Sequence, residues 1–343
     1  MNNFEEEILI TIKNNNLIQD GEKVLLGVSG GPDSIAMLSA LYEIQKERII
    51  DFNIYVAHIN HGIRENAKVD EKFVKEFCKE RNIECFVLNT NIKEIAKENK
   101  RGLEETGREI RYKFFEEIGN EISANKIAIA HNKKDNAETI IMNILRGTGI
   151  SGLCGMEIIQ NKYIRPLLFE TREKIEEYLK NKNIEPRIDE TNFENEYTRN
   201  KIRNIVLPYI QKEFNPNFID TLNRLSSIVK EENNYLKKIT EQAYKDILVE
   251  ENLKPEKDVY KSKDLPTIIL DLKKFCSLDR VIQKRIILYA INKLFGSTKG
   301  IEKIHIEDII KLCNRNIGNK YLTPNKNTKV VIKNKKIYIF AKK

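Results

Sequence analysis

Residues 23–34 read Lys-Val-Leu-Leu-Gly-Val-Ser-Gly-Gly-Pro-Asp-Ser and join an apolar run to a glycine-rich turn. The run Val24–Val28 has the composition of a short buried strand in a parallel sheet. After the turn, apolar residues from Ile35 to Tyr42 recur with helical spacing. A strand, a glycine turn and a helix N-terminus form a cradle for anions, because the glycines admit a close ligand and the helix amides and dipole favour phosphate.

The turn lacks the Gly-Lys-Ser/Thr ending of Walker-type phosphate loops, so it predicts a phosphate site of another kind. A glycine turn that binds no ligand is the alternative. The candidate phosphate-binding residues are Ser29, Gly30, Gly31, Pro32, Asp33 and Ser34.

The composition indicates a globular protein long enough for two domains, with 343 residues, 41% hydrophobic and 32% charged. No apolar run approaches the roughly 18–20 residues that span a bilayer, and the N-terminus lacks an apolar signal core, so we expect a cytoplasmic protein without a membrane partner. The five scattered cysteines include no Cys-x-x-Cys pair. This argues against disulfide, zinc-ribbon and iron–sulfur frameworks and favours five buried structural thiols.

The net charge of +8 is concentrated at the C-terminal end, where residues 309–343 hold ten Lys/Arg and no Asp/Glu. A basic tail of this kind favours a polyanionic partner such as nucleic acid. A general bias of the chain toward Lys, Asn and Ile is an equally good explanation.

Strands and helices alternate through the first two thirds of the chain. We expect strands at 24–28, 54–57, 85–88 and 127–130, and helices at 4–18, 35–42, 66–82, 102–119 and 135–146. This alternation predicts an α/β fold with a doubly wound parallel sheet, in which ligands bind at the carboxyl ends of the strands.

The alternation stops after Pro208, and Phe214-Asn215-Pro216-Asn217 interrupts the pattern. We therefore predict a first domain at 1–215 and a second, smaller, mainly helical α+β domain at 216–343. A long helix is expected over 218–248, and residues 329–332 and 336–340 predict a hairpin.

Two further clusters follow predicted strands. His58, His61 and Arg64 come after the second strand, where they could serve a nucleotide; no third ligand supports a metal site, and either histidine alone could be a polar turn residue. Asp135 and Glu138 stand three residues apart on one helix face, where they could hold an ammonium group or Mg²⁺, or simply favour the helix start. Arg199, Lys201 and Arg203 could follow a phosphate backbone or lie in solvent.

Taken in order, these motifs resemble the ATP-pyrophosphatase (PP-loop) superfamily and, within it, the tRNA(Ile)-lysidine synthetase family. The resemblance covers residues 20–210 closely and the C-terminal part loosely, chiefly at 316–320, as in a short-form member. Gly107, Asn132, Lys134 and Asn136 depart from the family pattern of alanine, histidine, aspartate and glutamine. The matching segments are 29–34, 58–64 (His-Ile-Asn-His-Gly-Ile-Arg), 105–112, 130–139 (Ala-His-Asn-Lys-Lys-Asp-Asn-Ala-Glu-Thr), 146–156, 165–168, 189–192 and 197–203.

The resemblance implies a ligase that joins L-lysine to C2 of the wobble cytidine in the CAU anticodon of tRNA(Ile), through an adenylated intermediate. It implies that the 29–34 loop holds ATP and that Asp33 binds Mg²⁺ or orients the phosphates. Asp135 and Glu138 would hold the lysine ammonium, His131 would meet the cytidine, and Arg111 and Arg203 would face phosphate or intermediate charge.

Two other functions stay open. One is another PP-loop tRNA-modifying enzyme such as a thiolase, against which the absence of paired cysteines argues. The other is a catalytically silent RNA-binding protein, against which the intact loop argues. The sequence leaves the oligomeric state open, a homodimer included.

Overall fold

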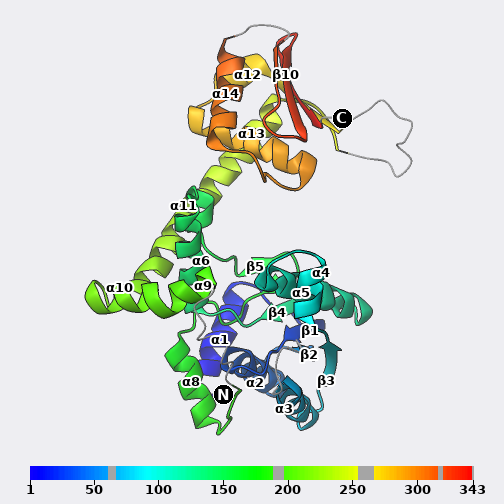
Figure 1. The fold of residues 1–343 in the computed structure, drawn as a ribbon, viewed down its shortest axis with the longest axis vertical. Helices are drawn as coiled ribbons and strands as arrows, with labels where there is room; N and C mark the ends of the chain where they lie inside the picture. The colour runs from blue at the N-terminus through cyan, green and yellow to red at the C-terminus, as the bar shows by residue number, and fades with distance from the viewer. Residues whose placement is uncertain (61–66, 188–196, 254–265, 316–319, 342–343) are drawn as a thin grey trace. The chain divides into compact units, whose positions relative to one another are not determined.

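The structure, a computed structural model, describes residues 1–60, 67–187, 197–253, 266–315 and 320–341. The chain divides into two compact units, Met1–Lys230 and Glu231–Lys343 (Figure 1). The division falls within one long helix, α11 (Phe218–Ile247). Each unit has a sheet and a core of its own. The boundary predicted near residue 215 divides a domain expected to catalyse from a domain expected to bind a partner. That division of roles stays a prediction.

The first unit contains a six-stranded sheet with the order β3-β2-β1-β4-β6-β5. All neighbouring strands run parallel except the pair β5–β6. The four strands predicted from the sequence are present and the parallel sheet is confirmed. The strands are β1 (Glu22–Gly27), β2 (Phe52–Asn60), β3 (Glu84–Asn89), β4 (Lys126–Ile129), β5 (Ile159–Gln160) and β6 (Tyr163–Ile164).

Helices cover both faces of this sheet, as a doubly wound fold requires (Figure 1). On one face, the core is built with side chains of α1, α2, α3 and α8; on the other, Phe114 and Phe115 of α5 lie against the strands. The helices of the first unit are α1 (Asn3–Asn14), α2 (Pro32–Lys46), α3 (Ala67–Lys79), α4 (Ile92–Glu98), α5 (Leu103–Glu121), α6 (Lys133–Leu145), α7 (Ile150–Leu153), α8 (Arg172–Asn181), α9 (Thr198–Lys201), the π-helix η2 (Ile202–Val206), α10 (Leu207–Glu213) and the start of α11.

Strand β1 lies at the centre of the fold and supplies side chains to both cores. Val24 and Leu26 point into one core and Leu25 into the other, which is the alternation of a strand buried on both faces. Gly27 ends the strand, and a Cβ there would lie 2.5 Å from the ring of Phe115. A glycine is therefore required for α5 to pack this closely against the strand.

The strand order brings the predicted site segments to one edge of the sheet. Strand β1 pairs with β2 on one side and with β4 on the other, all parallel. Their carboxyl ends therefore lie together, and each is followed by a segment that the sequence analysis singled out: the 29–34 loop after β1, His58 and Asn60 at the end of β2, and residues 131–138 after β4.

The second unit contains an antiparallel five-stranded sheet with the order β7-β8-β11-β10-β9. The predicted hairpin is confirmed as β10 and β11, with Lys333 paired to Lys336 at its turn. Side chains from one face of this sheet form a core with α12, α13, α14 and the C-terminal part of α11. The elements are β7 (Leu248–Asn252), β8 (Thr267–Asp271), α12 (Leu272–Cys276), α13 (Arg280–Phe295), α14 (Lys303–Asn314), β9 (Lys320–Leu322), β10 (Thr328–Lys333) and β11 (Lys336–Ala341).

The cysteines agree only in part with the expectation of five buried thiols. Cys78, Cys154 and Cys313 are buried and Cys85 is half-buried, but Cys276 is exposed at the end of α12. The expectation is wrong for Cys276, because an isolated cysteine in a short helix carries no pattern that fixes its face. Across the described ranges, no helix is both long and apolar enough to cross a membrane.

Candidate active site

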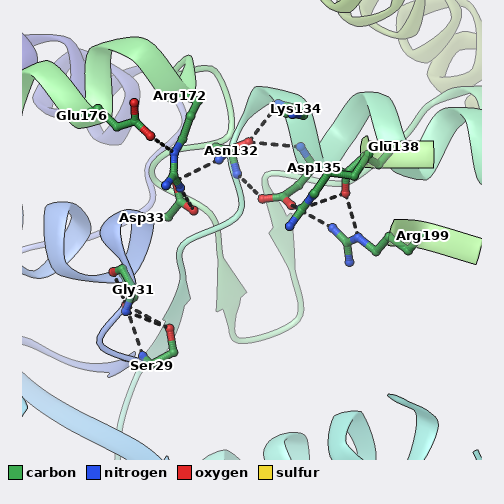
Figure 2. A network of polar contacts seen from close by, with 12 residues as sticks. Ser29, Gly31, Asp33, Asn132, Lys134, Asp135, Glu138, Arg172, Glu176 and Arg199 are labelled. Carbon is green, nitrogen blue, oxygen red and sulfur yellow. Dashed lines mark hydrogen bonds and ion pairs between the residues drawn. The ribbon is translucent and has the colours of Figure 1, made fainter. Parts of the chain in front are cut away.

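The 29–34 loop connects β1 to α2 and is shaped by its own serines (Figure 2). The amide of Ser29 donates to Ser34 Oγ at 3.2 Å, and Ser34 Oγ donates to the Gly31 carbonyl at 2.9 Å. Gly30 has a φ of +91°, a conformation that side chains rarely adopt. Helix α2 begins after Gly31 without a side-chain cap. Its first amides therefore face the loop, as an anion site requires.

Asn132 joins this loop to helix α6. Its side-chain Oδ1 accepts from the backbone amides of Lys134 and Asp135. Its backbone N–H donates to Asp135 Oδ2, which completes a capping box. Its Nδ2 donates to Asp33 Oδ1 at 2.9 Å, across 99 positions of sequence. The N-terminus of α6 is thereby tied to the phosphate loop through one side chain (Figure 2).

Asp135 and Glu138 lie on α6 directly beyond this cap, 7% and 0% exposed respectively. Two arginines from α9 and η2 pair with both of them. Arg199 donates to Glu138 Oε2 and to Asp135 Oδ1, each at 2.9 Å. Arg203 donates to Glu138 Oε1 at 2.5 Å, to Asp135 Oδ1 at 2.6 Å and to Glu138 Oε2 at 2.9 Å. The two buried carboxylates and the two half-buried arginine side chains form one compact cluster, which we call the acid–arginine cluster.

The charges in this cluster hold one another ionised. Burial alone would raise the pKa of Asp135, but the charges of Arg199 and Arg203, with the backbone hydrogen bond from Asn132, outweigh it and the pKa lies below its ordinary value. Burial likewise opposes the charge of Arg199, but the neighbouring carboxylates raise its pKa. Asp135 is therefore a carboxylate at neutral pH, and the N–H groups of Arg199 and Arg203 use both oxygens of Glu138 as acceptors.

His131 faces the same edge and is held as a neutral imidazole. Arg165 Nε donates to His131 Nδ1 at 3.1 Å, so Nδ1 is the acceptor and Nε2 carries the proton. Burial lowers the pKa of His131 to about 3; Arg199, Arg165 and Arg111 also act against the charged form, while Asp135 opposes them. His131 can therefore donate one N–H bond from Nε2 without carrying charge.

Asp33 is the carboxylate of the loop, and both of its oxygens are in use. Oδ1 accepts from Asn132, and Oδ2 accepts from Arg172 Nη1 at 2.8 Å. Burial raises the pKa of Asp33 despite the opposing charge of Arg172. Within the described ranges, no group of three or more His, Cys, Asp or Glu could hold a metal ion. A single carboxylate beside a phosphate loop suits Mg²⁺ only where phosphates and water supply most of its ligands.

The structure brings most of the predicted residues to this edge. His58 Nδ1 lies 2.8 Å from the Val28 carbonyl, and its Nε2 has no hydrogen-bond partner among the described residues. Arg111, on α5, is exposed, and its charge helps to lower the pKa of His131. His61, Arg64, the motif at 189–192 and the segment 316–319 lie outside the described residues.

Three positions have roles that were not predicted from the sequence. Asn132 departs from the family pattern, but an asparagine before a helix is also a strong N-cap signal. The pairing of Arg199 with the acids has no local signal, because nothing in a sequence fixes a tertiary partner. Asn223, on α11, gave no signal; its Nδ2 donates to the Lys133 carbonyl at 3.1 Å, and its Oδ1 accepts from Asn136.

Comparisons with known proteins agree with this geometry. A family model described as the PP-loop domain matches residues 1–210. The tRNA(Ile)-lysidine synthase of Caldanaerobacter subterraneus subsp. tengcongensis is 39% identical over 322 residues, which are 93% of this chain and 65% of that protein. The enzyme of the same name from Clostridioides difficile is 40% identical over 342 residues, 98% of this chain and 69% of that protein. The chain thus spans about two thirds of the length of these relatives.

Among solved structures, the U34-tRNA thiolase NcsA from Methanococcus maripaludis is similar to this chain with a TM-score of 0.55. The similarity covers 66% of this chain and 80% of that one, at 21% sequence identity. At this identity the similarity shows a shared fold and carries no argument about chemistry.

The neutral state of His131 predicts a pH dependence of stability. Because its pKa is about 3 in the folded chain and 6.5 ordinarily, protonation below pH 6.5 favours the unfolded chain. The contribution of the neutral His131 to the free energy of unfolding is fully present above pH 6.5. It decreases as the pH falls toward 3, by at most about 1.4 kcal/mol per pH unit. Thermal unfolding of wild type and of His131→Asn at pH 8, 7, 6 and 5 tests this. The wild type should lose more stability between pH 7 and 5 than the variant; parallel losses would contradict it.

Proposed function

The chain belongs to the tRNA(Ile)-lysidine synthase family of PP-loop proteins, and on that premise we propose that it joins free L-lysine to a tRNA. The acceptor is C2 of the wobble cytidine in the CAU anticodon of tRNA(Ile). ATP adenylates the cytidine O2 and releases pyrophosphate. The ε-amine of lysine then attacks C2, the C2–O bond to AMP breaks, and a proton leaves the nitrogen. The product, lysidine, pairs with A, so the tRNA reads AUA in place of AUG and accepts isoleucine.

One observation carries this proposal most directly: the phosphate loop and a buried acidic pair are tied together through Asn132. A reaction in which an amine displaces a phosphate-activated oxygen from a carbon atom needs an anion site for the phosphate beside a cation site for the amine. Asp33 and Asp135 each bond to the Asn132 residue, so the two sites are neighbours. An isolated nucleotide-binding loop would not require a carboxylate pair at this place.

We assign the ATP phosphates to residues 29–34, whose helix N-terminus suits them. Asp33 is the residue that would hold Mg²⁺, and a bound Mg²⁺ supplies charge neutralisation for the displacement of pyrophosphate. His58 stands beside the loop with an unpaired Nε2 among the described residues, which suits contact with the nucleotide.

We assign the lysine ammonium to Asp135 and Glu138. An unperturbed amine with a pKa of about 10.4 is a poor nucleophile at neutral pH, and carboxylates beside it can position it and take its proton. His131 offers Nε2–H to the cytidine or its adenylate. Arg111 and Arg203 supply positive charge for the phosphate that leaves as AMP.

We assign catalysis to residues 1–215 and tRNA binding to residues 216–343, and we place the enzyme in the cytoplasm with its tRNA. In the second unit, the outer face of the β10–β11 hairpin carries Lys329, Lys333 and Lys336. Lys329 Nζ lies 4.6 Å from the ring centroid of Tyr321, which is 62% exposed. Lysines interleaved with aromatic rings suit an RNA backbone and its bases.

The proposed reaction is tested with purified protein, ATP-Mg²⁺, labelled L-lysine and two CAU-anticodon tRNAs, one for isoleucine and one for methionine. We expect lysine to enter only the isoleucine tRNA, with one AMP released for each lysine incorporated. AMP release without incorporation would keep the ATP chemistry and overturn lysine as nucleophile. Neither product from folded protein would favour the silent RNA-binding protein.

The assignment of the hairpin to tRNA predicts the effect of a charge reversal. Lys333→Glu/Lys336→Glu keeps a like-charged cross-strand pair, so the hairpin is perturbed little while its charge becomes more negative by four units. We expect weaker tRNA binding in filter-binding assays and a salt slope lower by about 1 for each phosphate that the hairpin no longer neutralises. The matched control Lys46→Glu/Lys79→Glu makes the same charge change at the ends of α2 and α3. Equal losses of affinity in both double variants would contradict a specific role for the hairpin.

A further inference from the structure

We propose that Arg199 occupies the place of the substrate ammonium in the acid–arginine cluster and leaves it when lysine enters. The proposal rests on the proposed function, in which Asp135 and Glu138 hold that ammonium. It adds a residue that sets how readily the site accepts a cation.

Each carboxylate of the pair already accepts three hydrogen bonds, of the about four that an ionised carboxylate can take. Asp135 Oδ1 and both oxygens of Glu138 accept from Arg199 and Arg203, and Asp135 Oδ2 accepts from the amide of Asn132. An ammonium group needs close carboxylate contacts of the same kind. Each carboxylate has about one acceptor position left, so an ammonium that makes all three of its hydrogen bonds to the pair displaces at least one that an arginine makes.

The charge balance leads to the same conclusion. Two buried carboxylates and two guanidinium groups sum to zero, so an added ammonium would leave one uncompensated positive charge. An uncompensated buried charge costs several kcal/mol in proteins. Exchange of one guanidinium for the ammonium keeps the sum at zero, and the binding of lysine is therefore coupled to the release of an arginine.

Arg199 is the more weakly held of the two arginines. It makes two hydrogen bonds to the pair, whereas Arg203 makes three. Arg199 lies on the four-residue helix α9, and Arg203 lies one turn later in the π-helix η2. Arg203 is also attracted by the charge of Asp33 in the phosphate loop, and this attraction favours its present position.

The exchange lowers the apparent affinity for lysine in the free enzyme. A site that is open for only a fraction of the time binds its ligand more weakly by that fraction. Removal of the Arg199 charge leaves Asp135, Glu138 and Arg203 with a net negative charge. An arginine that merely supported the structure of the site would have the opposite effect, because its loss would weaken binding.

Isothermal titration of the full chain with free L-lysine tests the exchange. We expect Arg199→Gln to bind lysine about tenfold more tightly than wild type, and Arg199→Lys to return toward the wild-type affinity because it restores a competing cation. Lys201→Gln removes the same charge from an exposed position of α9 and should leave the affinity unchanged. Norleucine, which lacks the ε-amine, should show no gain with Arg199→Gln.

Asp135→Asn separates failure of the exchange from failure of the proposed function. If Asp135→Asn loses lysine but a folded Arg199→Gln binds it no more tightly than wild type, the exchange is overturned and the ammonium site stands. If Asp135→Asn binds lysine as well as wild type does, or if no variant binds it, both assignments are overturned. Circular dichroism melting of each variant establishes that it is folded.

Discussion

Two carboxylates buried next to each other must be neutralised, and much of the site is arranged by that requirement. Each buried ion costs several kcal/mol unless it is paired and hydrogen-bonded, and the loss of one partner from such a pair commonly costs about 3–5 kcal/mol. Asp135 and Glu138 meet this cost with Arg199 and Arg203, which come from a segment more than 60 positions later. The cluster therefore fixes where α9 and η2 lie against α6. The same cost makes the cluster sensitive to an added cation, because an ammonium group that enters it can replace an arginine.

The parallel sheet makes this arrangement available. Strand β1 stands between β2 and β4, so the segments that follow all three strands share one edge. Asn132 then joins two of these segments, since one side chain caps α6 and also bonds Asp33. A phosphate loop alone is a general device for anions. Its connection to a buried acidic pair places a cation site beside the anion site, as the proposed transfer onto an amine requires.

The sequence predicted the parts of the fold that have strong local patterns. The strand, loop and helix around residues 23–42, the alternation that follows and the C-terminal hairpin are all confirmed. Short elements such as α4 and α8 were missed, because a few turns of mixed residues carry little periodicity. Asp135 and Glu138 were placed on one face from spacing alone, but their partners were not, because an ion pair between distant segments has no local signature. The capping role of Asn132 had such a signature, and comparison with the family pattern obscured it.

The central claim is that the acidic pair beside the phosphate loop is the site of the lysine amine. A crystal structure of the protein with L-lysine and a non-hydrolysable ATP analogue tests it most directly. We predict the ε-nitrogen within about 3.2 Å of Asp135 and Glu138 oxygens, the phosphates on residues 29–34, and Arg199 withdrawn from the pair. Lysine bound elsewhere, with both arginines still on Asp135 and Glu138, would contradict the account.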